Sequence, residues 1–307
     1  MTFQQKRDKK YSQKSTWDFS SVKPFFYMLL RPRTFISAWK FIFSILRNFF
    51  LIQQMQVFHI THRPVINVQN ALDDKIPFEP DKVNTYLGFV AFFIKPLDML
   101  QKRLGYVKAA PYLRQHVKHL AAAYKNASSI YRYSMTTTNR PDYNENVAFK
   151  TIHAADPHLL CVPSLHVAIC IVIYSCYKAF FKEGILPEEE AQRRLNEIKL
   201  RAIAIIESVL FVKQHSVNCI PTAFYMVNAV FGEDFFSAEE AISFFDDIFA
   251  NSLEITSQVK QEIYEYFTLL FERNFLENSF NDKWQDSIKR WLKDYARQTG
   301  QELKRAD

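Results

Sequence analysis

The stretch Cys161-Val162-Pro163-Ser164-Leu165-His166 is followed without a break by an apolar run over residues 167–177. Because proline is tolerated in the first turn of a helix, Pro163 predicts that a helix begins here. The backbone N–H groups of the next three residues would then lack intrahelical partners, and such groups favour an anion, above all phosphate. A hydroxyl and an imidazole in the same turn add a hydrogen-bond donor and a group that titrates near neutrality. The stretch predicts either a phosphate site or a buried helix with a purely structural histidine.

Composition favours an all-α fold. The chain has 307 residues, enough for one large domain or two small ones with a sizeable core. It has only five glycines, and aromatic residues make up 16% of it, so the many tight turns of an all-β fold are not expected. Its four cysteines lie in or beside apolar runs without CxxC spacing, which favours buried thiols over a zinc site or disulfides. They are Cys161, Cys170, Cys176 and Cys219.

Positive charge gathers at the beginning of the chain. The formal net charge is +7, and residues 1–48 carry ten Lys and Arg against two Asp and Glu. A basic surface of this kind suits nucleic acid or an anionic membrane. No recognised nucleic-acid motif adjoins the basic run at residues 6–14, so we expect a solvated or lipid-facing segment and no nucleic-acid partner.

The first part of the chain divides into a tail and an aromatic helix. Residues 1–20 are charged and without periodicity, which predicts a basic flexible tail. Residues 34–58 are strongly apolar and aromatic but contain Lys40 and Arg47. A helix over these residues would span a membrane poorly and lie in its surface well. Residues 136–158 are predicted to form a loop.

Apolar segments define a predicted core at residues 21–232. The first, at residues 163–181, comes closest to the length of about 20 residues that a membrane-spanning helix needs. The second is predicted as one helix over residues 200–217, which Pro221 would break or kink.

The character of the chain changes after residue 232. A capping box at residues 237–240 predicts a helix start, and acids outnumber bases sixteen to nine in residues 233–307. Aromatic and apolar residues recur there at helical spacing. These features predict a soluble, helical C-terminal extension.

A second candidate site lies in the second core segment. On a continuous helix, Ser208, Phe211, His215 and Cys219 would share one face, and Asn218 would border it. An imidazole on an otherwise apolar face is costly unless another group pairs with it. His215 is therefore either a structural histidine or a partner of the earlier site.

Three short motifs give the chain a family resemblance. Arg140-Pro141, Pro163-Ser164-Leu165-His166, and Ser208 followed by Lys213-Gln214-His215 resemble the ordered motifs of the phosphatidic acid phosphatase type 2 superfamily. The resemblance covers roughly residues 70–230 and is closest to the branch with inositol-phosphoceramide-type transferases and related bacterial membrane phosphatases. It implies a helical bundle of the phosphatidic acid phosphatase type 2 and vanadium haloperoxidase type.

The resemblance also implies a phosphatase or phosphotransferase that acts on phosphate monoesters, above all lipid phosphates, without a metal or cofactor. His215 would attack phosphorus and form a phosphohistidine, and His166 would protonate the leaving alkoxide. Donors around the phosphate would supply most of the transition-state stabilisation. The phosphate-binding residues implied are Arg140, Ser164, Leu165, Lys213 and Ser208.

Departures from the family pattern leave an alternative open. Tyr133 stands where the first motif has a lysine, and Val209 stands where an arginine follows the third-motif serine. The aspartate that orients the nucleophilic histidine is replaced by Cys219, with Asn218 beside it as a possible orienting group. The alternative is a catalytically degenerate homologue that binds lipid or a protein partner at a membrane.

For location, the resemblance and the basic, aromatic beginning imply a bacterial-type inner membrane or membrane-associated protein, with a cytoplasmic protein as the alternative. We expect no metal site. His59 with His62 and His116 with His119 have the spacing of helical metal ligands, but neither pair has an accompanying Glu-x-x-His motif or cysteine.

Overall fold

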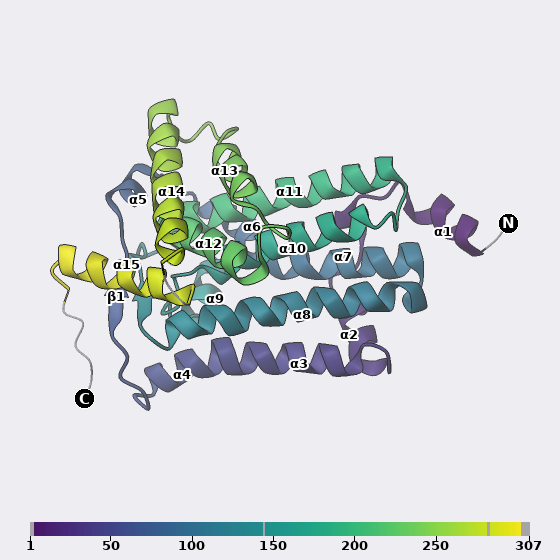
Figure 1. The fold of residues 1–307 in the computed structure, drawn as a ribbon, viewed down its shortest axis with the longest axis horizontal. Helices are drawn as coiled ribbons and strands as arrows, with labels where there is room; N and C mark the ends of the chain where they lie inside the picture. Colours follow the sequence, from purple (N-terminus) through teal and green to yellow (C-terminus); the bar gives the residue numbers. More distant parts are fainter. Residues whose placement is uncertain (1–2, 144, 281–282, 302–307) are drawn as a thin grey trace.

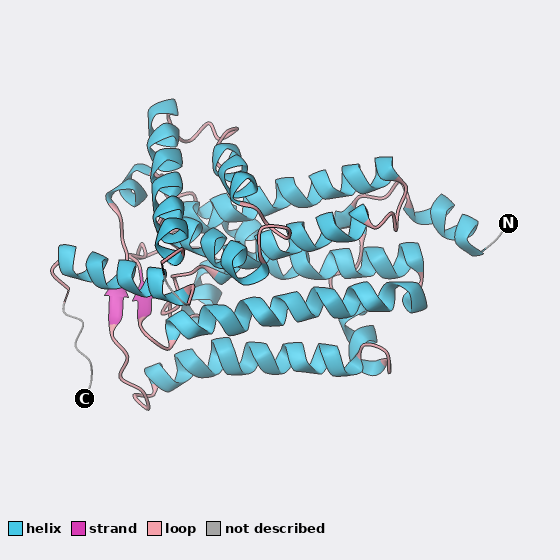
Figure 2. Ribbon diagram, viewed as in Figure 1, coloured by secondary structure: helices cyan, strands magenta, loops and turns pink. Residues whose placement is uncertain are grey.

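The computed structural model describes residues 3–143, 145–280 and 283–301. Helices account for 70% of the chain and strands for 2% (Figure 2), which confirms the prediction of a predominantly helical protein. The described residues contain one small sheet, in which β1 (Val65–Asn67) pairs in parallel with β2 (Met135–Thr137).

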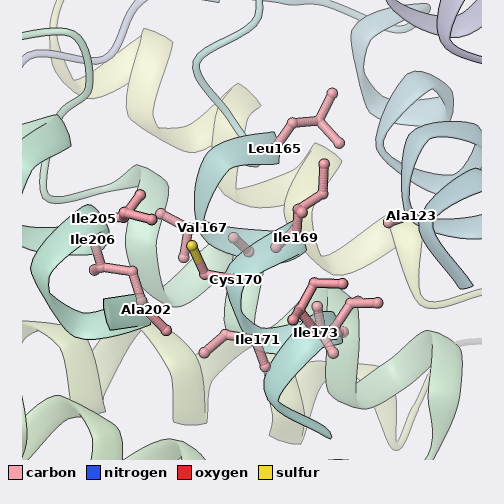
Figure 3. Packing of buried hydrophobic residues seen from close by; sticks show 14 of the residues in the cluster. Ala123, Leu165, Val167, Ile169, Cys170, Ile171, Ile173, Ala202, Ile205 and Ile206 are labelled. Atoms are coloured by element: carbon pink, nitrogen blue, oxygen red, sulfur yellow. The ribbon is translucent and has the colours of Figure 1, made fainter. Parts of the chain in front are cut away.

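Helix α10, Leu165–Lys182, lies in the middle of the helical bundle (Figure 1). Its residues 167–173 are all buried, and consecutive helical residues point in different directions, so the helix is covered on every side. Figure 3 shows Val167 and Cys170 beside Ile205 of a neighbouring helix. The helices that pack around α10 are α7 (Phe89–Leu104), α8 (Tyr106–Tyr131), α11 (Glu188–Phe211) and α12 (Cys219–Phe231).

Residues 3–20 correct the prediction of a flexible tail. Helix α1 (Phe3–Tyr11) and the 3-10 turn η1 (Thr16–Asp18) pack against α7. Trp17 stacks on Phe92 with ring centroids 5.7 Å apart. The partners of this segment lie 75 or more residues further along the chain, as Trp17 and Phe92 do, so local periodicity could not reveal them.

The apolar helix predicted at residues 34–58 forms along one edge of the bundle (Figure 1). It consists of α3 (Phe35–Ile45), a π turn η2 (Leu46–Phe50) and α4 (Leu51–Val57), preceded by α2 (Lys23–Leu30), and α3 packs along α8. This segment and α10 are both long and apolar enough to cross a membrane. Their burial differs: 72% of the apolar window of α10 is buried inside the protein, against 22% for the segment at residues 35–57.

The region between the edge helix and the core holds short elements. Residues 136–158 are not only a loop, because β2 begins the region and helix α9 (Val147–Ala155) follows. Asn146 caps α9 by accepting a hydrogen bond from the backbone N–H of Ala148 at 2.8 Å. The remaining short elements are α5 (Ala71–Lys75), η3 (Pro80–Lys82) and α6 (Val83–Leu87).

The second core segment is not one helix. Helix α11 ends at Phe211, residues 212–218 form a turn, and α12 begins at Cys219. Lys213 adopts a φ of 55°, in the left-handed region, which is incompatible with a continuing right-handed helix. Pro221 therefore lies in the first turn of α12, where a proline costs little, and it does not break a helix.

The C-terminal extension is helical, as predicted, and shares the main hydrophobic core. Ser237 and Glu240 form the predicted capping box. Tyr225 of α12 donates a hydrogen bond to the Trp284 carbonyl at 2.9 Å, and α14 packs along α12. The helices of the extension are α13 (Ala238–Asp247), α14 (Ser257–Asn278) and α15 (Gln285–Gln298).

A buried ion-pair cluster ties the N-terminal segment to the bundle. Glu190 of α11 accepts hydrogen bonds from Arg103 of α7 and Arg194 of α11, both at 2.7 Å. The exposed fractions of Arg103 and Arg194 are 2% and 0%. Arg103 also pairs with Asp8 of α1, and Arg194 donates to the Tyr11 carbonyl at 3.0 Å.

Glu190→Gln is expected to lower the free energy of unfolding by about 3–5 kcal/mol, because it leaves two buried guanidinium groups without their shared counter-charge. Glu189→Gln removes the same charge from an exposed neighbour and should change stability by less than about 0.5 kcal/mol. Urea unfolding of the two variants is the measurement. Equal stability of the two would contradict a structural role for the cluster.

Candidate functional site

Ser164 is the residue before helix α10, which begins at Leu165, two residues after the predicted start at Pro163. It is the N-cap, so Pro163 precedes the helix and does not occupy its first turn. The Ser164 hydroxyl oxygen accepts a hydrogen bond from the Val167 N–H at 3.4 Å, and the Ser164 N–H donates to the Cys219 carbonyl at 3.4 Å. The cap thus joins the start of α10 to the start of α12.

His215 lies in the turn between α11 and α12 and reaches this cap. Its Nε2 atom is 3.3 Å from Ser164 Oγ and 3.4 Å from His166 Nδ1. Its Nδ1 atom is buried and has no hydrogen-bond partner among the described residues. Nε2, the atom that would act as a nucleophile, therefore faces the other candidate groups.

Asp73, which the sequence did not single out, holds this turn in place. Its Oδ1 accepts from the Val217 N–H and its Oδ2 from the Asn70 N–H, both at 2.7 Å. At the other end of the turn, the Val209 carbonyl accepts from the backbone N–H of His215 at 3.1 Å. Burial raises the pKa of Asp73, and the hydrogen bonds it accepts oppose that rise. The one signal near Asp73 in the sequence is the capping box that it forms with Asn70, and this predicts a helix start but not a contact with residue 217.

His166 is held between two aromatic rings. Its ring stacks on Tyr86 with centroids 4.7 Å apart and lies tilted against Phe89 at 4.5 Å. These contacts fix the plane of the imidazole and leave Nδ1 toward His215. Tyr86 and Phe89 come from α6 and the beginning of α7, so the site also depends on the segment before the core helices.

Arg140 lies near the histidines but is paired with a carboxylate. Its Nη2 is 3.0 Å from Asp156 Oδ2, and its Nη1 donates to the Asp156 carbonyl at 3.1 Å. Arg140 Nε is buried without a partner among the described residues. Asp156 was not a predicted site residue.

The cavity at the histidines is small. Its volume is about 20 Å³, room for roughly one water molecule and not for a phosphate group. His158, another residue that sequence reasoning missed, borders it and lies 2.9 Å through Nε2 from Thr138 Oγ1. The lining residues are Phe49, Asp156, His158, Leu160, Cys161, Leu165, His166 and His215.

Burial keeps the histidines neutral at pH 7. It lowers the pKa of His166 to about 4, against a partial opposing effect of Asp156. The pKa of His215 lies well below 6.5, first because of burial and then because of the neighbouring His166. A neutral imidazole is an available nucleophile, whereas an acid with a pKa near 4 is mostly deprotonated at neutral pH.

Of the nine predicted site residues, Leu165, His166 and His215 line the cavity, Arg140 and Ser164 lie outside its lining, and the other four have partners elsewhere. Lys213 donates through Nζ to the carbonyls of Asp73 and Ile76. The Ser208 hydroxyl donates to the Ile205 carbonyl at 2.7 Å, within its own helix. Asn218 donates to the Val68 carbonyl and accepts from the Tyr266 hydroxyl, while Cys219 is fully buried and contributes its backbone carbonyl. The shared helical face expected of residues 208–219 does not exist, because the helix ends at Phe211.

The two histidine pairs with the spacing of metal ligands, His59 with His62 and His116 with His119, lie away from this cavity. His59 and His62 are exposed and stack on each other at 6.3 Å. His116 is fully buried, and His119 Nδ1 lies 3.5 Å from Cys176 Sγ. Among the described residues, no group of three or more His, Cys, Asp or Glu side chains is arranged to hold a metal ion.

The lowered histidine pKa values should make the protein less stable in acid. As the pH falls below 6.5, an unfolded chain protonates its histidines, whereas folded His166 stays neutral until about pH 4. The unfolded state binds more protons in this window, so the free energy of unfolding should fall with pH, by at most about 1.4 kcal/mol per pH unit for each histidine. His166→Asn should flatten this dependence and the exposed His62→Asn should not. Denaturant unfolding between pH 4 and 7 checks this, and parallel profiles for wild type and His166→Asn would contradict it.

The arrangement brings together groups that can transfer protons and favour an anion. Two neutral imidazoles and a hydroxyl meet at the beginning of a buried helix, whose N–H groups favour an anion. A guanidinium lies close enough to lower the pKa of His215. No family model, curated protein or solved structure matches this chain.

Proposed function

We propose that the protein is a phosphatase or phosphotransferase acting on phosphate monoesters, in particular lipid phosphates, with a helical bundle of the phosphatidic acid phosphatase type 2 kind. The observation that carries the proposal is the contact of His215 Nε2 with both Ser164 Oγ and His166 Nδ1. Ser164 and His166 come from the beginning of α10, and His215 comes from the turn before α12. Arg140 comes from a third segment, after β2. Ser164 and His166 thus both lie within 3.4 Å of His215 Nε2, and the charge of Arg140 acts on the same histidine, which supports the proposal.

In the proposed reaction, His215 Nε2 attacks phosphorus and the bond from phosphorus to the ester oxygen breaks. His166 gives a proton to the leaving alkoxide and then takes one from the water or alcohol that attacks the phosphohistidine. Arg140, the Ser164 hydroxyl and the Leu165 N–H hold the equatorial oxygens, where positive charge and donors stabilise the transition state. A bound phosphate would also favour protonated His166, which offsets the loss of the protonated form that burial causes.

Substrate entry requires a change at the cavity. A phosphate group needs more than the 20 Å³ present, and Arg140 is held by Asp156. An incoming phosphate competes with the Asp156 carboxylate for the guanidinium, since both accept in the same paired geometry. Asp156 then acts as a counter-ion that the substrate displaces.

The second candidate is a catalytically degenerate, membrane-associated protein that binds lipid or a protein partner. Two observations favour it: the cavity is too small for a phosphate group, and the buried His215 Nδ1 has no carboxylate or other described partner to orient the ring. Neither Asn218 nor Cys219 takes over the missing aspartate. Phosphate release assays separate the two candidates.

We expect metal-independent phosphate release from phosphatidic acid or p-nitrophenyl phosphate, with inhibition by vanadate, a mimic of pentacoordinate phosphorus. His215→Ala should abolish turnover and the acid-labile phosphoenzyme, and His166→Ala should slow turnover by about 10²–10⁴-fold while a phosphoenzyme can still form. His62→Ala is the exposed control. Activity lost in EDTA and restored by a metal, or a His215→Ala variant with the wild-type rate, would refute the mechanism. A folded protein without turnover would support the degenerate alternative.

Asp156→Asn should free Arg140 and remove a negative charge from the cavity wall, so vanadate and phosphate should bind several-fold more tightly. Asp142→Asn removes the same charge from an exposed position of the same region. Isothermal titration with vanadate measures both variants. Equal affinity in Asp156→Asn, Asp142→Asn and wild type would show that the Arg140 pairing does not limit anion binding.

A further inference from the structure

The outer side of the edge helix carries a continuous apolar stripe. Its large side chains recur at steps of three and four residues, the spacing of one helical face, and each is 46–64% exposed. Isolated exposed apolar residues are ordinary, but a row along a whole helix marks an interaction surface. The stripe consists of Ile36, Trp39, Phe43, Leu46 and Phe50.

A basic groove runs beside this stripe, between the edge helix and α8. Its volume is about 470 Å³, and no carboxylate lines it. Three polar side chains in its wall are hydrogen-bonded to one another: Asn48 donates to Ser44 Oγ at 3.1 Å and accepts from Ser128 Oγ at 3.2 Å. Its four cations are Lys40, Arg47, Lys125 and Arg132.

These cations have no negative partner among the described residues. Another cation, Arg63, lies near Arg132, and its pKa is lowered first by burial and then by the charge of Arg132. Four cations without a carboxylate among them, beside hydrogen-bonded hydroxyl and amide groups, favour an anion with several acceptor oxygens.

The stripe and the groove belong to one surface, because Phe43 is part of both. Lys40 and Arg47 lie one position beyond Trp39 and Leu46, so cations border the apolar row along its length. Apolar side chains next to long basic ones suit the boundary between acyl chains and anionic headgroups.

The exposed charges of the neighbouring helix α8 favour one orientation of the edge helix at a membrane. The edge helix is long enough to cross a bilayer, but α8, which packs along it, exposes Lys108, Arg114, Lys118 and Lys125. Spanning would bring these charges into the hydrocarbon region at a high cost. A helix lying in the plane of the surface keeps them in water.

We propose that the stripe of the edge helix lies in the plane of an anionic membrane surface, with a phospholipid headgroup phosphate bound in the groove between α3 and α8. This inference does not depend on phosphoryl transfer. It does place the membrane next to the histidine cavity, because the π turn sends Phe49 to the cavity wall while Phe50 is exposed.

Vesicle binding by the full-length protein tests the headgroup site. Wild type should sediment with vesicles of phosphatidylcholine and phosphatidylglycerol, less so as salt rises, and weakly with phosphatidylcholine alone. The double variant Lys40→Gln/Arg47→Gln should bind at least about tenfold more weakly. Arg114→Gln/Lys118→Gln removes the same charge from the exposed side of α8 and should bind nearly as wild type does. If both double variants lost vesicle binding equally, the headgroup site in the groove would be refuted, and the net charge of the protein alone would explain the binding.

The depth of Trp39 tests the in-plane orientation. Trp39 is 49% exposed, whereas Trp17 stacks on Phe92 and Trp291 is 4% exposed. Lipids brominated near the headgroup should quench the fluorescence of Trp39 more than lipids brominated at the end of the acyl chain. The Trp39→Phe variant should lose this quenching. Stronger quenching by chain-end bromine would mean a spanning helix and overturn the proposal. If the protein formed a dimer in the absence of lipid and did not bind vesicles, the stripe would be an interface with a second copy of the chain, and the membrane proposal would be refuted.

Discussion

Burial of α10 on every side along residues 167–173 is the constraint on which the structure depends. A helix that is apolar on every side cannot face water, and here its neighbours on all sides are long helices of the same chain. Burial of each large apolar side chain contributes about 1.5–3 kcal/mol relative to exposure. The surrounding helices then take their charged residues outward or pair them, as Arg103 and Arg194 pair with Glu190. The edge helix is the exception, because its outer side stays apolar and uncovered.

The position of the histidines follows from this burial. The N-terminus of α10 has to end inside the protein, and the Ser164 cap and the Cys219 carbonyl satisfy part of its backbone hydrogen bonding. His166 and His215 share this poorly solvated place, so their pKa values fall and both rings are neutral at pH 7. The same surroundings strengthen the Arg140 to Asp156 pair, which occupies the guanidinium that an anion would need.

The turn between α11 and α12 shows how distant residues place a site. A continuous helix would put His215 on one face with Ser208, but the chain turns at Lys213 instead. Asp73 holds the far side of the turn, and the Lys213 ammonium binds carbonyls of the same segment. A charge that the motif assigns to phosphate therefore serves to attach the turn to residues 73–76. Asp73 accordingly acts as a positioning residue for His215.

The sequence by itself determined the helical class, the buried helix after Pro163, the capping box at Ser237 and the apolar edge helix, because each depends on spacing or capping within a few residues. It also named Ser164, His166, His215 and Arg140, although not the contacts between them. Only the tertiary structure decided that the N-terminal residues pack on α7, that residues 212–218 turn, and that Asp73 and Asp156 hold site residues. The physical reason is range: propensity and periodicity report interactions between near neighbours. A buried ion pair or a hydrogen bond across 144 residues, such as that between Val217 and Asp73, forms only once the chain has folded.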